Sequence, residues 1–173
     1  MKRITAVFIA FIGLVLIFPS CTYSLKLNGT QIPITMKTLR VDFFENNAPL
    51  VINTLSQQFT EALKTRIRNT TRLSIVRGEA DAVMSGSITD YNIAPVSINA
   101  TSNNVAPIAG QSQLTITVNV KYIYDADKKL SFEQSFSKSE QFAGDIASHE
   151  QTLIADITKQ LTEDIFNKAF ENW

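Results

Sequence analysis

Cysteine and histidine are almost absent from this chain of 173 residues, since each occurs only once. A single cysteine excludes an intrachain disulfide bond. One cysteine and one histidine also exclude most transition-metal sites, which are built from clusters of these residues. We therefore expect neither a metal site nor a cofactor.

Excess charge of either sign is also lacking, because 16 basic residues balance 16 acidic ones. A chain without a basic surplus has no overall attraction for phosphate, so we expect no binding to nucleic acid. With 45% hydrophobic residues and no net charge, the composition excludes a disordered chain. The length suits a single domain.

One apolar run without charge stands out, and it lies at the N-terminus. Lys2 and Arg3 precede residues 4–18, which contain no charged side chain. This run is shorter than the roughly 20 residues of a transmembrane helix and is typical of a signal peptide. We interpret residues 1–20 as a lipoprotein signal peptide, with a transmembrane anchor as the alternative.

Cys21 follows this run directly, and the sequence Phe18-Pro19-Ser20-Cys21 resembles a bacterial lipobox. In such a motif the cysteine sulfur is acylated and the peptide is cut before the cysteine; a free thiol in a secreted protein is the alternative. Three acyl chains would anchor the protein permanently, because two membrane signals already suffice. Thr22 is not the Asp that retains many lipoproteins in the inner membrane, so by analogy we expect the outer membrane. Without Lys2 and Arg3, 14 basic residues face 16 acidic ones, a net charge of −2.

The mature chain begins with a polar stretch, residues 21–37, which we interpret as a lipidated tether before a single domain, 38–173. At the start of this domain, apolar and polar residues alternate as in a half-buried strand with Leu39, Val41 and Phe43 inward. Residues 46–49 then supply helix-start chemistry. An amphipathic helix follows, because apolar residues recur at helical spacing: Ile52, Leu55, Phe59, Leu63 and Ile67.

The second half of the domain is rich in strand patterns. Residues 82–96 favour a strand, and residues 99–113 form an aperiodic stretch that we expect to be a mobile loop. The clearest alternation places one set of residues on a single strand face: Leu114, Ile116, Val118, Val120, Tyr122 and Tyr124. Residues 125–129 are a hairpin turn, after which Leu130, Phe132 and Phe136 continue an antiparallel partner.

A second helix closes the chain. Residues 148–151 (Ser-His-Glu-Gln) resemble a capping box. The apolar stripe that follows has helical spacing: Leu153, Ile154, Ile157, Leu161, Ile165, Phe166, Ala169 and Phe170. We therefore predict an α+β fold, in which a small mixed or antiparallel sheet has two amphipathic helices packed on one face, an α/β sandwich.

Motifs of catalysis are missing. His149-Glu150 begins like a zinc-protease motif, which needs a second histidine that this chain does not have. No Gly-x-Ser-x-Gly elbow occurs, and Ser85-Gly86-Ser87 lies within an expected strand. We predict that the protein is not an enzyme. A lipid-tethered hydrolase that uses two carboxylates stays open as an alternative.

Several segments together resemble one lipoprotein family, and they are spread over nearly the whole mature chain. They are residues 21–24 (CTYS), 32–33 (IP), 44–57 (FENNAPLVINTLSQ), 86–91 (GSITDY), 95–96 (PV), 114–118 (LTITV), 132–136 (FEQSF) and 163–170 (EDIFNKAF). This pattern resembles the lipopolysaccharide-assembly lipoprotein family LptE, in the form seen in Bacteroidota.

The resemblance implies a function. LptE proteins partner and plug the lumen of the outer-membrane β-barrel LptD, assist its assembly, and help to insert lipopolysaccharide into the outer leaflet. The expected location is therefore the outer membrane, lipid-anchored, with the domain on the periplasmic side or inside the barrel lumen. A generic outer-membrane lipoprotein, acting as an adaptor of another envelope transport machine, is the alternative.

The resemblance also suggests ligand contacts, because family members are thought to contact lipopolysaccharide phosphates through basic side chains near loop tips. Lys128 and Lys129 occupy the expected hairpin tip, and Lys121 lies on the polar face of the preceding strand. These three lysines are the candidate lipopolysaccharide contacts. The alternative is that they are ordinary solvated surface charges.

Overall fold

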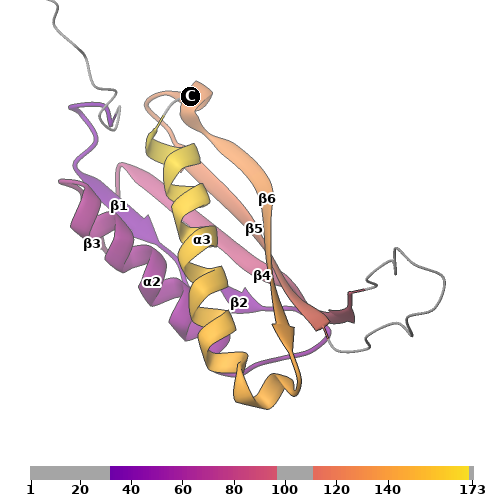
Figure 1. The fold of residues 1–173 in the computed structure, drawn as a ribbon. Coiled ribbons are helices and arrows are strands. Elements are labelled where there is room, and N and C mark those ends of the chain that lie inside the picture. Colours follow the sequence, from indigo (N-terminus) through magenta and orange to yellow (C-terminus); the bar gives the residue numbers. More distant parts are fainter. Residues whose placement is uncertain (1–31, 97–110, 172–173) are drawn as a thin grey trace, which may run out of the picture.

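A mixed sheet covered on one face by two helices forms the domain, as the computed structural model shows for residues 32–96 and 111–171 (Figure 1). Its elements in chain order are β1 (Thr38–Val41), β2 (Glu45–Asn46), α2 (Leu55–Thr70), β3 (Ser74–Val76), β4 (Ala82–Pro95), β5 (Gln111–Tyr124), the 3₁₀ turn η1 (Lys128–Leu130), β6 (Phe132–Ala143), the 3₁₀ turn η2 (Ile146–Ser148) and α3 (Glu150–Phe170). The predicted signal peptide, Cys21 and residues 99–110 of the predicted loop lie outside the described residues.

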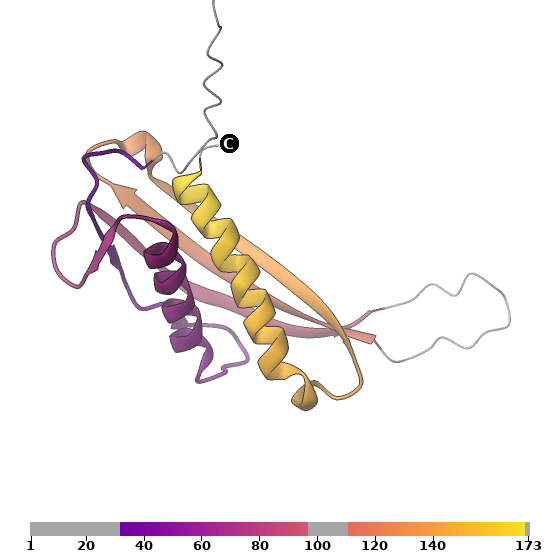
Figure 2. The ribbon, with the colours of Figure 1, turned by 60° about the vertical axis from the view of Figure 1, so that its left-hand side comes forward.

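The sheet has the strand order β3-β1-β4-β5-β6, with β2 paired to β4. Strand β1 runs parallel to both β3 and β4, whereas β4, β5 and β6 form an antiparallel series. Helices α2 and α3 lie side by side on one face, and the opposite face carries no element of the described chain (Figure 2). The predicted α+β fold with both helices on one face is confirmed.

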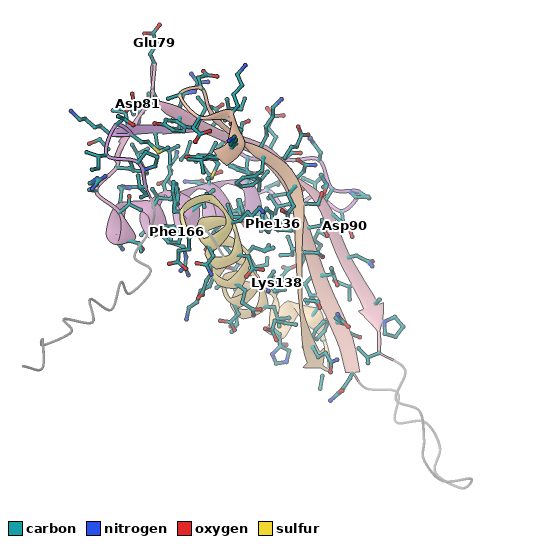
Figure 3. The ribbon with its side chains drawn as sticks, turned by 90° about the horizontal axis from the view of Figure 1, so that it is seen from above. Glu79, Asp81, Asp90, Phe136, Lys138 and Phe166 are labelled. Carbon is teal, nitrogen blue, oxygen red and sulfur yellow. The ribbon has the colours of Figure 1, made fainter. Side chains whose placement is uncertain are left out.

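The core lies between the sheet and the two helices. On β5 the six predicted inward residues are all buried, and the predicted stripes of both helices are buried almost throughout. Phe136 of β6 and Phe166 of α3 are both buried in this core, whereas Asp90 lies away from α3 (Figure 3). A helical stripe and a strand face can be buried in one layer because each exposes only one apolar side.

The first strand differs from its prediction at Phe43. Its side chain is 57% exposed, whereas the next residue, Phe44, is fully buried. Leu39 pairs with Ala82, an offset of 43 residues, but Glu45 pairs with Ser87, an offset of 42. One extra residue between β1 and β2 therefore reverses which side chains point inward, as a β-bulge does.

The first helix begins later than predicted, at Leu55. Asn46 does not cap it; its side chain accepts a hydrogen bond from the backbone N–H of Ala48 (3.1 Å) and donates one to the carbonyl of Ile52 (3.3 Å). Asn46 therefore stabilises a turn before the helix, which is the competing use of this residue type. Ile52 is half-buried in that turn, outside the helix.

The capping box predicted at residues 148–151 is also wrong. Ser148 belongs to η2, the helix N-cap is His149, and the His149 side chain makes no capping hydrogen bond. The carboxylate of Glu150 instead accepts a hydrogen bond from the Tyr91 hydroxyl at 2.9 Å. A tertiary contact to β4 thus takes the place of the predicted local one.

Two boundaries of the domain are packed more closely than their composition suggests. Residues 32–37, at the end of the predicted tether, contact the domain: Met36 is 1% exposed and the Thr35 hydroxyl lies 2.9 Å from that of Tyr124. Residues 111–113, at the end of the predicted loop, belong to β5. No helix among the described residues has the length and apolar character needed to cross a membrane.

Candidate functional site

Where β4, β5 and β6 form it, the open face of the sheet carries mainly short, uncharged polar side chains, whereas β1 beside them carries Arg40, which forms an ion pair with Asp42 at 3.0 Å. Alternation along β4, β5 and β6 and the pairing of these strands place them together. We call this surface the hydroxyl–amide face and define it by eleven residues: Ser85, Ser87 and Asn92 from β4, Gln113, Thr115, Thr117 and Asn119 from β5, and Ser135, Ser137, Ser139 and Gln141 from β6.

Strand pairing arranges these side chains in rows across the sheet. Ser87, Asn119 and Ser135 form one row, and in the next the hydroxyls of Thr117 and Ser137 lie 3.0 Å apart. A bulge in β4 lies beside these rows, where the register shifts between Ile88 and Asp90. Because these side chains are short, they project little above the sheet. Their hydroxyl and amide groups can both donate and accept hydrogen bonds.

Few charges lie on the same face of these three strands. Asp90 is beside Thr117, and Lys121 forms an ion pair with Glu133 across β5 and β6, with 3.9 Å between Lys121 Nζ and Glu133 Oε2. That pair lies near the end of the face where the β5–β6 hairpin turns. Lys121 is thus on the polar face of its strand, as predicted, but beside an opposite charge.

The other two predicted lysines lie at the hairpin tip. Lys128 and Lys129 are exposed in η1, whose start is capped by the Asp127 side chain, an acceptor for the backbone N–H of Lys129 at 3.0 Å. The three lysines therefore do not form one cluster, because Lys121 belongs to the open face of the sheet.

A small cavity of about 150 Å³ adjoins this tip, and Lys129 lines it together with Lys168 of α3. Lys168 Nζ lies 5.9 Å from the centre of the Phe132 ring, within the range of a cation–π contact. Sequence reasoning missed Lys168. No local pattern could have indicated it, because the fold alone brings the end of α3 to the hairpin.

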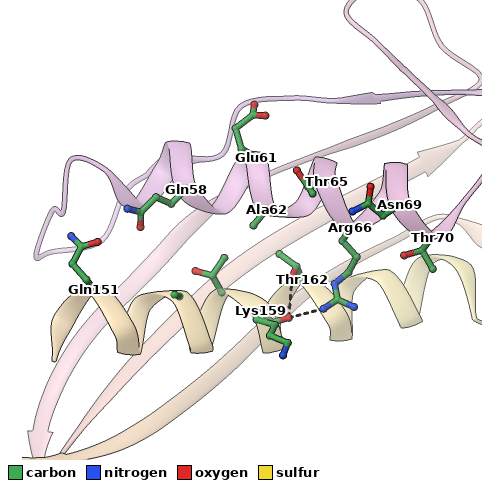
Figure 4. A pocket seen from close by; sticks show the side chains of 12 residues that line it. Gln58, Glu61, Ala62, Thr65, Arg66, Asn69, Thr70, Gln151, Lys159 and Thr162 are labelled. Atoms are coloured by element: carbon green, nitrogen blue, oxygen red, sulfur yellow. Dashed lines mark hydrogen bonds between the residues drawn. The ribbon is translucent and has the colours of Figure 1, made fainter.

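A groove of about 650 Å³ separates the outer sides of α2 and α3 (Figure 4). Gln58 and Gln151 lie at one end and Asn69 at the other. Arg66 crosses it, with one guanidinium nitrogen 3.3 Å from the Lys159 carbonyl oxygen. The ionisable residues that line this groove are Glu61, Arg66 and Lys159.

The described residues also lack a metal centre: residues 32–96 and 111–171 contain no group of three or more His, Cys, Asp or Glu side chains placed to hold an ion. His149 is exposed at the start of α3, with its ring 6.3 Å from that of Phe142.

Asp81 accepts hydrogen bonds from several neighbours, and its role is structural. Backbone N–H groups of Lys37 and Thr38 and the Thr38 hydroxyl all donate to its carboxylate at 2.8–2.9 Å. These hydrogen bonds lower the pKa of Asp81. They join the start of β1 to the residue preceding β4.

Comparison with known proteins identifies the family. The sequence model of the family described as "LptE: Lipopolysaccharide-assembly" matches residues 36–169, which is most of the chain. The chain belongs to the LptE family. No curated protein sequence matches it. The LptE resemblance predicted from the sequence is thus confirmed.

Solved structures support the fold of this LptE-family protein. Rare lipoprotein B from Shewanella oneidensis is 12% identical, with a TM-score of 0.53 over 76% of this chain and 92% of that one. Lipoprotein B from Nitrosomonas europaea, described as uncharacterized, is 14% identical, with a TM-score of 0.52 over 75% and 79%. A hypothetical protein from Chlamydia trachomatis is 8% identical, with a TM-score of 0.54 over 77% and 95%.

Membership of the LptE family assigns this protein to the lipoproteins of lipopolysaccharide assembly. It also confirms the prediction of a non-enzymatic protein, since the family is one of assembly factors. The three predicted lysines and Cys21 stay predictions.

Proposed function

We propose that this LptE-family protein is anchored to the outer membrane by lipid on Cys21 and plugs an LptD-type β-barrel. In this role it assists assembly of the barrel and the insertion of lipopolysaccharide into the outer leaflet. The observation that carries the proposal is the family match, which extends from Met36 to Ala169 and so includes every described helix and strand apart from the last residue of α3. The resemblance of residues 44–57 further favours the Bacteroidota form.

The build of the domain suits this role. Its core is continuous from the sheet to both helices, so it can enter a lumen as one rigid body. Barrel interiors are polar, and the open side of this sheet is polar as well. A lipid anchor beside the barrel would raise the effective concentration of the plug there.

We also propose that Lys128 and Lys129 contact lipopolysaccharide phosphates, with Lys121 as a third candidate. The two tip lysines are exposed, and Lys168 adds a further positive charge beside their turn. An ammonium group suits phosphate as a compact point charge. Lys121 can exchange its partner, because its ion pair with Glu133 is exposed and such pairs contribute little stability.

Affinity purification of the tagged protein from detergent-extracted outer membranes tests the main proposal, with a Cys21→Ser version beside it. Recovery of one large β-barrel in about equal amount supports the plug. A lower recovery with Cys21→Ser would show that the anchor contributes. If the tagged protein is recovered alone, or together with an unrelated transporter, the proposal is overturned. Recovery with a transporter would favour an adaptor of another transport machine.

The lysine proposal is tested by a Lys128→Glu/Lys129→Glu variant and, separately, by Lys121→Gln. We expect the double variant to bind labelled lipopolysaccharide at least about tenfold more weakly, with a reduced dependence on salt. Lys159→Glu, which changes an exposed lysine on α3, is the matched control. Equal binding by the double variant and the wild type would refute a role for the tip.

A further inference from the structure

The two exposed surfaces of the domain differ in their content of charge. The outer sides of α2 and α3 carry many ionised residues: Glu61, Lys64, Arg66, Arg68, Asp156, Lys159, Glu163, Asp164 and Lys168. The open side of β4, β5 and β6 carries the eleven residues of the hydroxyl–amide face and three charges, two of which form an ion pair. Both surfaces are free of other elements of the described chain, so exposure to water alone does not explain the difference.

Short uncharged side chains suit a surface that becomes covered by a polar partner. A lysine or glutamate loses much rotamer freedom when it is immobilised, and its charge must be desolvated. Serine and threonine have fewer rotatable bonds, and their hydroxyls can either donate or accept a hydrogen bond. Depletion of charge is also the usual mark of the central part of a protein interface.

The open side of the three strands, of which this face is the uncharged polar part, approaches the size of such an interface. Strands β4, β5 and β6 contain 14, 14 and 12 residues. At about 3.4 Å per residue and about 4.8 Å between strands, they cover roughly 40 Å by 14 Å. That plan area of the whole open side, roughly 600 Å², approaches the ~800 Å² that each partner contributes to a standard stable interface. The hydroxyl–amide face occupies about half of its length.

The chemistry of the face also selects among the possible surfaces of a barrel. The lipid-facing outside of an outer-membrane barrel is apolar, whereas its inside is polar. The large apolar side chains on the open side of β4, β5 and β6 lie at the end where Val83 pairs with Ile123. The rows from Ser87 to Gln141 can therefore form hydrogen bonds with a polar wall, and they offer nothing to an apolar one.

We propose that the hydroxyl–amide face is the surface through which this protein contacts the polar inner wall of its β-barrel partner. The charged outer sides of α2 and α3 face away from that contact. This inference rests on the proposed plug function and adds to it which side of the sandwich meets the wall.

Site-specific photocrosslinking in cells that express the full lipoprotein tests the orientation. A photoreactive residue is placed at Thr115, Thr117 or Ser137 on the face and, as controls, at Thr65 or Lys159 on the helices. We expect strong adducts from the face positions only, with the barrel identified by mass spectrometry and its crosslinked residues on lumen-facing strand positions. Adducts mainly from the helix positions, or adducts between two copies of this chain at the face, would overturn the inference.

Charge insertion gives an independent measurement. Thr117→Arg combined with Ser137→Arg is expected to lower the amount of barrel that co-purifies by about tenfold, while Thr65→Arg leaves it unchanged. Thermal unfolding of each purified variant checks folding, because all three positions are at the surface. Full recovery of the barrel with the folded double variant refutes the inference.

The two proposals can fail separately. If the wild type brings down the barrel but crosslinks through its helices, the plug function holds and the proposed orientation is wrong. If the wild type brings down no barrel, the plug function is wrong and the orientation is refuted with it.

Discussion

The two faces of β5 differ sharply, although their residues alternate along a single strand. Ile116 and Val118 are fully buried under the helices, whereas Thr115 and Thr117 on the other face remain half-exposed. The covered face therefore determines stability, because burial of apolar surface is the main stabilising term. The open face contributes little to folding and is free to be selected for contact with another molecule.

A substitution of Gly86 is expected to show the largest difference in stability between the covered face and the open face. A Cβ at this position would clash with the Asn119 carbonyl oxygen and lie 2.6 Å from Phe44 Cε1. We expect Gly86→Ala to lower the free energy of unfolding by about 4 kcal/mol or more, measured by urea denaturation.

The neighbouring residue is the control for this change. Ser87 belongs to the hydroxyl–amide face, so Ser87→Ala should alter the free energy of unfolding by less than about 0.5 kcal/mol. Similar losses in the two variants would contradict the assignment of Gly86 to the covered side.

Ile116 and Thr115 provide the same comparison on β5. Ile116 is 0% exposed, so Ile116→Ala should cost about 2–5 kcal/mol of unfolding free energy. Thr115→Ala should cost less than about 0.5 kcal/mol, because nothing packs over its side chain in the described chain. Chemical denaturation of the two variants under one set of conditions decides the point; a smaller loss for Ile116→Ala than for Thr115→Ala would reverse the assignment of the faces.

Tyr91, a buried residue of the covered face, should make the stability of the protein depend on pH. Burial first, and then the hydrogen bond to Glu150 and its charge, raise the pKa of Tyr91 in the folded protein. The Tyr91 hydroxyl therefore loses its proton at a lower pH in the unfolded chain than in the folded protein. The free energy of unfolding should fall as pH rises above the ordinary tyrosine pKa of about 10. Tyr122, raised by burial and by Tyr124, adds to the same trend.

The variant Tyr91→Phe removes one of these two contributions. At pH 8 we expect a loss of about 1 kcal/mol for the missing hydrogen bond. Between pH 9 and 11 the stability of the variant should decline less steeply than that of the wild type. Parallel declines in thermal stability across this range would show that Tyr91 titrates no differently in the folded and unfolded states.

Thr158 gives the smallest expected effect, and with the opposite sign. Its hydroxyl is buried and has no hydrogen-bond partner among the described residues, whereas that of Thr162 donates to the Lys159 carbonyl at 3.0 Å. Thr158→Val should raise the free energy of unfolding by about 1 kcal/mol, because it removes an unsatisfied polar group. Thr162→Val should lower it by a similar amount. Destabilisation by both changes would indicate that the Thr158 hydroxyl gains a partner in solution.

Much of the covered face could be predicted from the sequence. The stripe from Leu55 to Ile67 and the alternation from Leu114 to Tyr124 are local patterns, and each was confirmed as an apolar side of its element. Such patterns are reliable because the periods of helix and strand are set by backbone geometry within a few residues.

The errors arose where distant parts of the chain decide a local choice. Phe44 rather than Phe43 is buried because β2 pairs with β4 in a register shifted by one residue from that of β1. Ser148 does not cap α3, and Tyr91 of β4 bonds Glu150 instead. A cap predicted from sequence competes with tertiary contacts that the sequence does not display.

Some features of the candidate surfaces could likewise be predicted from the sequence, whereas others depend on the fold. The exposure of Lys128 and Lys129 could be predicted, because a charged segment between two strands forms a turn. The approach of Lys168 to that turn could not. The polar side of β5 was visible in the sequence, but its continuation onto β4 and β6 depends on which residues pair.

By itself, the sequence determined the kinds of elements, the apolar side of each and the resemblance to the LptE family. The first two depend on residues that are neighbours in the chain, and the resemblance depends on short sequence segments. Only the tertiary structure decided the register of β2, the starts of both helices and the union of three strand faces into one uncharged surface. The physical reason is that strand register and helix ends are settled by packing and hydrogen bonds between residues far apart in the chain.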